Sequence, residues 1–389
     1  MQHRPEARAG PYDRPRGQGQ TGPSSGMSAQ LLTAKLKQAR SVEELLRLAG
    51  ERSNAFNHIH CSAAWNHLGK QAWECRKPQH QPGLARLLRL TGARVPEAGA
   101  RELANIVHGV AKSRVAGARA LFAAVAEAAV PRVCEFKPQE IANTVWAYAA
   151  AAHTAPALLN AFAVAAPPRL PDFNAQNFAN TVWAYAKVGH SAPALLDEIA
   201  VAARLRLHDF KAQDLANTAW AYAKAGHSAP ALLDAIAAAA PPRLRDFDPQ
   251  ALANTAWAYA TANRMAPALL DAISAAAAPR LREFHTQEIA NLAWAYAKAG
   301  HSAPALLDAI AVAAVPRLCD FKPQEIANTA WAYATLAHEA PALLDAIAED
   351  GRKRMGDFNA QDRDSLVRAY ATAGHEAPAW LEVITEIVS

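Results

Sequence analysis

Apolar and polar positions along the chain repeat in a block of 37 residues. The phrase ANTVWAYA, or a near copy, recurs with one tryptophan per block, at Trp146, Trp183, Trp220, Trp257, Trp294 and Trp331. A phenylalanine opens each block on the same period, at Phe136, Phe173, Phe210, Phe247, Phe284, Phe321 and Phe358. A repeat of this length is typical of solenoid proteins, in which each unit buries its apolar face against its neighbours.

The block that begins at Phe210 indicates which elements a unit contains. Apolar residues at helical spacing, among them Leu215 and Tyr222, predict a first helix that Gly226 ends. A second helix is predicted from Pro230, and the Pro-Pro-Arg segment behind it terminates or kinks that helix. Each unit is therefore predicted to be a helical hairpin, and the chain an all-α fold, an α-solenoid.

The ends of the array depart from the repeat, as the capping units of solenoids do. We expect about seven good units from residue 136 and one decayed unit before them, with Asn105 in register and His108 in the tryptophan position. Arg368 takes that position in the last unit. The expected division is residues 1–27, a disordered or targeting leader; residues 28–97, a helical lead-in with a degenerate repeat; and residues 98–389, the repeat array.

Composition argues against several classes of protein. The sequence contains no uncharged apolar run long enough to span a bilayer, so no membrane association is expected. Cys61, Cys75, Cys134 and Cys319 are far apart, which argues against a zinc site and a disulfide framework. Because the sequence has no phosphate-cradling glycine loop, HExxH motif or nucleophile elbow, we expect no enzyme, no cofactor and no metal.

Charge is unevenly distributed. The net charge is +5, but residues 1–131 hold 19 basic and 9 acidic residues, whereas residues 132–389 have a net charge of −5. Binding of single-stranded nucleic acid depends on positive charge. The acidic balance therefore counts against RNA binding by the array, unless lysines line its concave side and acids its convex side.

The phrase FKPQEIANTAWAYA at 321–334 combines the recurring Gln, Asn, Trp and Tyr. This combination resembles the octotricopeptide and heptatricopeptide repeats of organellar RNA-binding proteins, which include chloroplast translation factors and FAST-kinase-like mitochondrial proteins. The resemblance covers roughly residues 98–389, and residues 39–70 look like the usual lead-in of such proteins. It implies binding of single-stranded organellar RNA by an adaptor in transcript processing, RNA stability or translation regulation. Many relatives end in a small RAP domain, whereas this chain stops at a repeat, so no catalytic role is carried over.

The first 40 residues suggest a location. They carry seven basic and two acidic residues. An arginine-rich, acid-poor leader resembles an organellar transit peptide and predicts the mitochondrion or the chloroplast. A plain disordered tail on a cytoplasmic protein is the alternative.

Candidate RNA contacts come from columns that vary between units, because helical-repeat proteins of other kinds read one base per repeat with two or three side chains. The second and fifth positions of the unit are polar and lie near each other at a helix start. They are Lys137 and Glu140, Asn174 and Asn177, Lys211 and Asp214, Asp248, His285 and Glu288, Lys322 and Glu325, and Asn359 and Asp362. These residues are base-reading candidates, and helix capping is the favoured alternative. At the fifteenth position, Lys187, Lys224 and Lys298 could contact RNA phosphates. The slightly favoured alternative is that they only interact favourably with the dipole at the C-terminal end of the helix.

The constant columns leave further alternatives open. Gln and Asn four residues apart, such as Gln213 and Asn217, could contact RNA, although an asparagine hydrogen-bond ladder between units is favoured. The tryptophan and tyrosine columns are expected in the core. A constant arginine such as Arg206 could track phosphates, but the acid three residues later favours a local salt bridge. The histidine column is interpreted as turn residues.

Two functions therefore remain. We prefer an RNA-binding adaptor, which by one base per repeat would take a target of about seven to nine nucleotides and could need a protein partner. The alternative is a protein–protein interaction scaffold, which the acidic balance of residues 132–389 supports.

Overall fold

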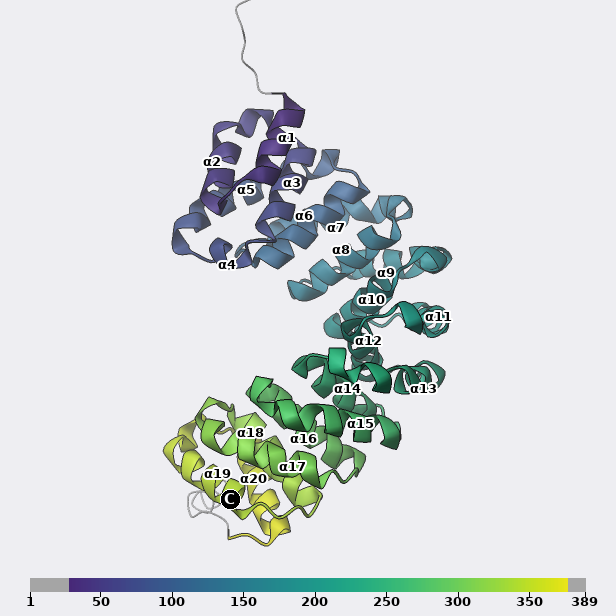
Figure 1. Ribbon diagram of the computed structural model, residues 1–389. Coiled ribbons are helices and arrows are strands. Elements are labelled where there is room, and N and C mark those ends of the chain that lie inside the picture. The colour runs from purple at the N-terminus through teal and green to yellow at the C-terminus, as the bar shows by residue number, and fades with distance from the viewer. Residues whose placement is uncertain (1–27, 377–389) are drawn as a thin grey trace, which may run out of the picture.

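The computed structural model describes residues 28–376, which fold into helices joined by short turns, with no strand in that part of the chain. The predicted all-α solenoid is confirmed. Its helical hairpins follow one another along an arc (Figure 1). The leader and the expected second helix of the last unit lie outside the described residues.

The first helices of successive units form an inner row. Each packs along the first helix of the next unit. The row contains α6 (Ala100–Ser113), α8 (Pro138–Ala150), α10 (Ala175–Val188), α12 (Ala212–Ala225), α14 (Pro249–Thr261), α16 (Thr286–Ala299), α18 (Pro323–Thr335) and α20 (Ala360–Ala373). In Figure 1, α10, α12 and α14 lie toward the hollow side of the arc.

The second helices form an outer row and end in short 3-10 helices. The outer helices are α7 (Arg119–Ala129), α9 (Pro156–Ala165), α11 (Pro193–Arg204), α13 (Pro230–Ala239), α15 (Pro267–Ala277), α17 (Pro304–Ala314) and α19 (Pro341–Lys353). The 3-10 helices are η4 (Val130–Glu135), η5 (Pro167–Asp172), η6 (Leu207–Asp209), η7 (Pro241–Asp246), η8 (Ala278–Glu283), η9 (Val315–Asp320) and η10 (Met355–Asp357). Apart from α13, which contacts α11 more than η6, each outer helix from α9 to α19 contacts the 3-10 helix of the preceding unit more than it contacts the preceding outer helix.

The lead-in continues both rows. Its helices are α1 (Ala29–Gln38), α2 (Val42–Glu51), η1 (Ser53–Ala55), α3 (His58–Leu68), α4 (Ala72–Cys75), η2 (Pro78–His80), α5 (Gln81–Gly92) and η3 (Val95–Glu97). Helix α3 packs along α6 in the inner row, and α5 contacts α7 in the outer row. A side chain at Gly109 of α6 would overlap the backbone of Trp65 in α3, so this glycine permits the close approach of the two helices.

Alanine explains why the inner helices pack so closely, because the distance between two helix axes depends on the side chains at the contact. Two alanine columns lie buried between inner helices, at Ala142, Ala179, Ala216, Ala253, Ala290 and Ala327, and at Ala147, Ala184, Ala221, Ala258, Ala295 and Ala332. The phenylalanine that opens each unit and the tyrosine of each inner helix from α8 to α20 are also buried and supply the bulk of the core. The tyrosines therefore lie where the sequence predicted them.

The predicted helix ends are confirmed in the unit of Phe210. Helix α12 ends at Ala225, and Gly226 follows with φ of 63°, the left-handed conformation that glycine adopts readily. Three units place another residue there: Ala152, Asn263 and Ala337 have φ of 50°, 51° and 50°. The Pro-Pro-Arg segment ends the outer helix by continuing as the 3-10 helix η7.

Candidate nucleic-acid interface

One face of each inner helix remains accessible to solvent. On α12 this face consists of Gln213, Asn217, Trp220 and Lys224, at intervals of four, three and four residues, which place them on one side of a helix. The remaining residues between Leu215 and Ala223 are buried. Because neighbouring inner helices cover the flanks of α12 and the outer helices lie behind it, this face points to the hollow side of the arc (Figure 1).

The same four positions form a continuous surface, which we call the inner stripe. Its members are Arg101, Asn105, His108 and Lys112 on α6; Gln139, Asn143, Trp146 and Ala150 on α8; Gln176, Asn180, Trp183 and Lys187 on α10; Gln213, Asn217, Trp220 and Lys224 on α12; Gln250, Asn254, Trp257 and Thr261 on α14; Gln287, Asn291, Trp294 and Lys298 on α16; Gln324, Asn328, Trp331 and Thr335 on α18; and Gln361, Ser365, Arg368 and Thr372 on α20. None of these side chains is fully buried.

The tryptophan column runs along the middle of the inner stripe. The expectation of a buried column held only in part, because each of its six indoles packs against the core but is only half-buried. Ring centroids of neighbouring tryptophans lie 6.5 Å apart for Trp146 and Trp183, and 6.4 Å apart for Trp257 and Trp294. His108 extends the column, with its ring 5.2 Å from that of Trp146. Burial, together with nearby Lys112, lowers the pKa of His108 to about 4, so this ring is neutral at pH 7.

The glutamines and asparagines of the inner stripe carry free amide groups. A hydrogen-bond ladder between asparagines of neighbouring units was expected, and none is present among residues 28–376. The glutamines are exposed and the asparagines half-buried, as Gln213 and Asn217 illustrate. Their amides can therefore donate to and accept from a ligand without breaking a bond within the protein.

The charges of the inner stripe differ in sign from those exposed on the outer helices. The inner stripe contains no Asp or Glu, and its basic members are Arg101, Lys112, Lys187, Lys224, Lys298 and Arg368. An exposed aspartate column lies on the outer helices instead, at Asp197, Asp234, Asp271, Asp308 and Asp345. The acidic net charge of residues 132–389 thus coexists with a basic inner stripe.

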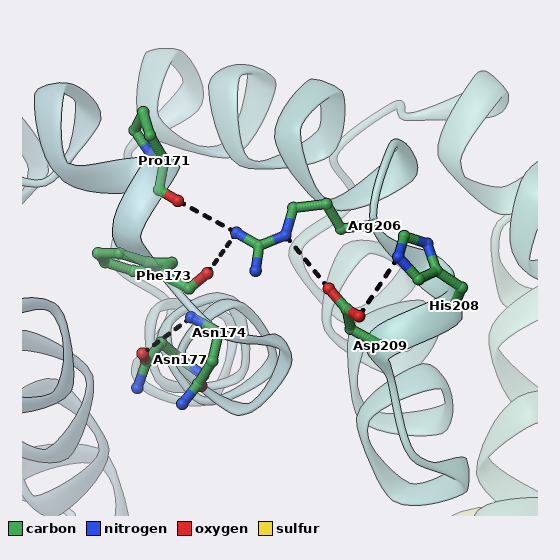
Figure 2. A network of polar contacts seen from close by, with 7 residues as sticks. All are labelled: Pro171, Phe173, Asn174, Asn177, Arg206, His208 and Asp209. Carbon is green, nitrogen blue, oxygen red and sulfur yellow. Dashed lines mark hydrogen bonds and ion pairs between the residues drawn. The ribbon is translucent and has the colours of Figure 1, made fainter.

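The second and fifth positions of the unit occupy the N-cap and the third residue of the inner helices. In α10, Asn174 and Asn177 each accept a hydrogen bond from the backbone N–H of the other, at 2.9 and 3.1 Å (Figure 2). In four other units the fifth-position carboxylate accepts a hydrogen bond from the second-position backbone N–H: Glu140 from Lys137, Asp214 from Lys211, Glu288 from His285, and Glu325 from Lys322. In the remaining two units the second-position side chain accepts from the fifth-position backbone N–H: Asp248 from Ala251, and Asn359 from Asp362. The favoured capping role is confirmed.

Capping leaves the two columns unequally accessible. Second-position side chains such as Lys211 are exposed, whereas Asp214 is half-buried, and Asn177, Glu325 and Asp362 are buried. Burial raises the pKa of Asp214, and its hydrogen bond with the Lys211 backbone opposes that rise. Base reading by these pairs remains a prediction, in which the exposed second position is the better placed member. Lys211 and Lys224 lie at the two ends of α12, so their backbones are about 20 Å apart at a rise of 1.5 Å per residue.

The constant arginines connect neighbouring units. The guanidinium of Arg206 donates to the backbone carbonyl of Phe173, at 2.6 Å, and to that of Pro171, at 3.2 Å (Figure 2). Equivalent bonds join Arg243, Arg280, Arg317 and Arg354 to the phenylalanine carbonyl 33 residues earlier. The expected ion pair three residues on is present for Arg132, Arg206 and Arg280. These arginines therefore hold units together rather than form only local pairs.

The histidine column also joins units, which its interpretation as turn residues missed. The Nε2 atom of His301 lies 2.8 Å from a carboxylate oxygen of Asp271 in the preceding outer helix. His190, His227, His338 and His375 make the same contact with Asn160, Asp197, Asp308 and Asp345, and Arg264 pairs with Asp234 in their place. The histidines and constant arginines thus hold neighbouring units together, whereas the glutamines, asparagines and lysines of the inner stripe make no side-chain hydrogen bond or ion pair among residues 28–376. Arg368, at the end of the stripe, pairs with Asp364.

Residues 28–376 contain neither a membrane span nor a metal-binding cluster. No helix there is both long and apolar enough to cross a membrane. No group of three or more His, Cys, Asp or Glu residues in that range is arranged to hold a metal ion.

The sequence carries a signal for the inner stripe that was not recognised as one surface. Glutamine, asparagine, tryptophan and the fifteenth residue recur at intervals of four, three and four, which is the spacing of one helix face. Taking the tryptophans as core residues broke that pattern.

Comparison with known proteins gives one extensive match. The sequence model of the family described as RNA-editing substrate-binding complex 6 protein matches residues 101–304. That of a family described as protein of unknown function (DUF1601) matches residues 306–329. No curated protein matches the chain. Among similar structures is a chain of "Homology model of the full-length AP-3 complex in an intermediate open conformation", with 10% identity, a TM-score of 0.31, and coverage of 92% of this chain and 74% of that one. A similarity this low carries no argument about function.

Proposed function

This chain belongs to the RNA-editing substrate-binding complex 6 protein family, and from that premise we propose that it binds single-stranded RNA along the inner stripe as a non-catalytic adaptor. The family name associates the protein with RNA and with an assembly. Kinship with octotricopeptide and heptatricopeptide repeats remains part of the proposal, because it rests on the shared Gln, Asn, Trp and Tyr.

The observation that carries the proposal is the chemistry of the inner stripe. Partly exposed indoles offer flat surfaces on which bases stack, an interaction worth about 1–3 kcal/mol per base. Free amides beside them suit base edges and sugar hydroxyls, and the lysines at the fifteenth position suit phosphates. The inner stripe contains no acidic residue that would repel the negatively charged RNA backbone.

The repetition of this chemistry has a consequence for specificity. Glutamine, asparagine and tryptophan are identical in six consecutive inner helices, from α8 to α18. Identical contacts at each step cannot distinguish one base order from another. We therefore assign sequence-tolerant binding to these three columns and any selectivity to the varied fifteenth and second positions, such as Lys224 and Lys211.

The test removes the inner lysines from the full chain. Replacing Lys187, Lys224 and Lys298 by Gln should lower the slope of log K against log salt by about 2, since each phosphate contact on a single strand contributes about 0.7. Binding is measured by fluorescence anisotropy with a labelled RNA of about twelve nucleotides. A control replaces Arg204, Arg245 and Arg282, which are exposed at the ends of α11, η7 and η8. An equal loss in the control would reject the inner stripe as the binding surface.

A protein-interaction scaffold is the second candidate, and one observation favours it. Val164, Val201 and Val312 occupy the same position of three outer helices and are 80%, 60% and 77% exposed. Selection from a random RNA pool separates the two candidates. If the wild-type chain retains RNA and the lysine variant does not, the result supports the adaptor. If the wild-type chain retains no RNA, the result favours the scaffold.

We place the adaptor in the mitochondrion. The support is the arginine-rich leader, with seven basic and two acidic residues in positions 1–40. Fusion of residues 1–40 to a fluorescent protein tests this location. Import of the fusion supports it, and a diffuse signal would contradict it.

A further inference from the structure

A cavity of about 590 Å³ lies between two consecutive inter-helix turns at the N-terminal end of the array. Its walls come from the turn between α6 and α7 and from the turn between α8 and α9. The polar side chains among its lining residues are Arg114, Arg119, His153 and Thr154. No acidic residue lines this cavity.

Departures from the repeat create this composition. Arg114 takes the left-handed position after the inner helix, with φ of 52°, where four later units have glycine. Arg119 is the first residue of α7, where the later outer helices begin with proline. Ala123 occupies the position at which later units carry the Asp or Asn that contacts the histidine. His153 therefore lacks the partner that His301 has.

A second cavity serves as an internal comparison. It lies between the corresponding turns of α18 and α20 and is lined by His338, Glu339, Thr372 and His375, among others. Both of its histidines contact aspartates, and it contains a carboxylate of its own. The fold thus forms a recess at this place in more than one unit, but in the recess of α6 to α9 the only charged side chains are those of the arginines Arg114 and Arg119.

The basic cavity adjoins the inner stripe. Ala150, the fifteenth residue of the first good unit, lines it. Lys112, a basic member of the stripe, precedes Arg114 by two residues. Neither arginine has an ion pair or a side-chain hydrogen bond within the described residues. The backbone at the start of α7 also lacks a side-chain cap, which leaves its N–H groups available to an anion.

We propose that this cavity binds a phosphate group of an RNA strand held on the inner stripe. Two guanidinium groups bind phosphate oxygens through charged hydrogen bonds, and the imidazole of His153 and the hydroxyl of Thr154 supply further donors. The assignment of RNA as the source rests on the proposed function. The phosphate belongs either to the end of the strand or to its backbone.

The experiment uses the full chain and two substitutions of different kinds. Arg114→Gln with Arg119→Gln removes the guanidinium groups, and Ala123→Asp introduces the carboxylate that later units place beside the histidine. Because Ala123 is exposed and Asp is tolerated at this position in other units, the second variant is expected to fold. Arg204→Gln with Arg245→Gln is the control for loss of two charges.

Affinity is measured for RNA of one sequence with a 5′-phosphate or a 5′-hydroxyl. Both cavity variants should bind about tenfold more weakly than the control, and the double arginine variant should lower the salt slope by about 0.7 to 1.4. A loss confined to phosphorylated RNA assigns the terminal phosphate, and an equal loss with both RNAs assigns the backbone. Equal losses in cavity and control variants would overturn the proposal.

Failure of the cavity can be told from failure of RNA binding. If the cavity variants bind RNA normally while the inner lysine variant does not, the cavity proposal falls and the proposed function stands. If no RNA binds, the proposed function and the RNA source both fall. Inorganic phosphate, titrated at constant ionic strength while the NMR signals of the His153 ring are followed, then decides whether the cavity is an anion site. Shifts that Ala123→Asp abolishes support such a site, and unchanged signals would reject it.

Discussion

Tyr222 in α12 donates a hydrogen bond to the backbone carbonyl of Leu196 in α11, with 2.7 Å between the two oxygens. The same bond joins each inner helix from α8 to α20 to the preceding outer helix, always across 26 residues. It ties the two rows together across a unit boundary, in a place that water does not reach.

Replacing Tyr222 by Phe should lower the free energy of unfolding by about 1 kcal/mol, the net value of one buried hydrogen bond. The ring stays in place, so little packing is lost. Urea titration followed by circular dichroism measures the change. An unchanged transition midpoint would show that the hydroxyl contributes nothing net to the joint between units.

Ala337 follows an inner helix in the left-handed conformation, where Gly300 serves in another unit. Ala337→Gly should therefore raise the free energy of unfolding by roughly 1 kcal/mol, because an alanine side chain is strained at positive φ. Gly300→Ala is the matched control and should lower stability by a similar amount, since no atom within 4 Å would obstruct the added carbon. Changes of the same sign in both variants would contradict this explanation.

Trp257 lies at the centre of the tryptophan column, with neighbours on both sides at 6.2 and 6.4 Å. Trp257→Leu keeps an apolar side chain against the core but removes the stacking surface. We expect RNA affinity to fall by about 1–3 kcal/mol. Anisotropy measures the affinity, and quenching of tryptophan fluorescence by RNA in the wild-type chain checks that bases reach the column.

Val312→Ala is the control for Trp257→Leu, because it shortens an exposed side chain on the outer row. It should leave RNA binding unchanged. If Trp257→Leu also leaves it unchanged while the chain remains folded, the tryptophans are packing residues and not stacking surfaces.

Lys211 and Asp214 separate capping from base reading. Asp214→Ala removes the carboxylate that accepts the Lys211 N–H and should destabilise the chain by about 1 kcal/mol. Lys211→Ala leaves that backbone bond intact and should change stability little. Selection of RNA from a random pool then reveals whether Lys211→Ala alters preference at one nucleotide. Unchanged preference would remove the second position as a base reader.

Much of the fold was predictable from the sequence, because each unit carries its own helix signals. The apolar spacing of Leu215 and Tyr222 and the glycine at Gly226 placed α12 correctly. The capping role of the second and fifth positions was also favoured correctly, since it depends on backbone groups within four residues.

Contacts between units were predicted less well. The bonds of Arg206 with Phe173 and of His301 with Asp271 join residues 33 and 30 positions apart. A repeat makes every column periodic, so the period alone does not tell which columns meet across a boundary. The salt bridge expected for each arginine involves the acid three residues later, whereas the bond to the preceding unit was not predicted.

The sequence by itself determined the unit, its two helices and their ends, because these depend on backbone hydrogen bonds and side-chain spacing within 37 residues. Only the tertiary structure decided that the first helices form the inner row. That arrangement leaves the indole of Trp220 only half-buried beside Asn217, and it separates the lysines from the outer aspartates. The reason is physical: which face of a helix is covered depends on the neighbours that pack against it, and those neighbours come from other units.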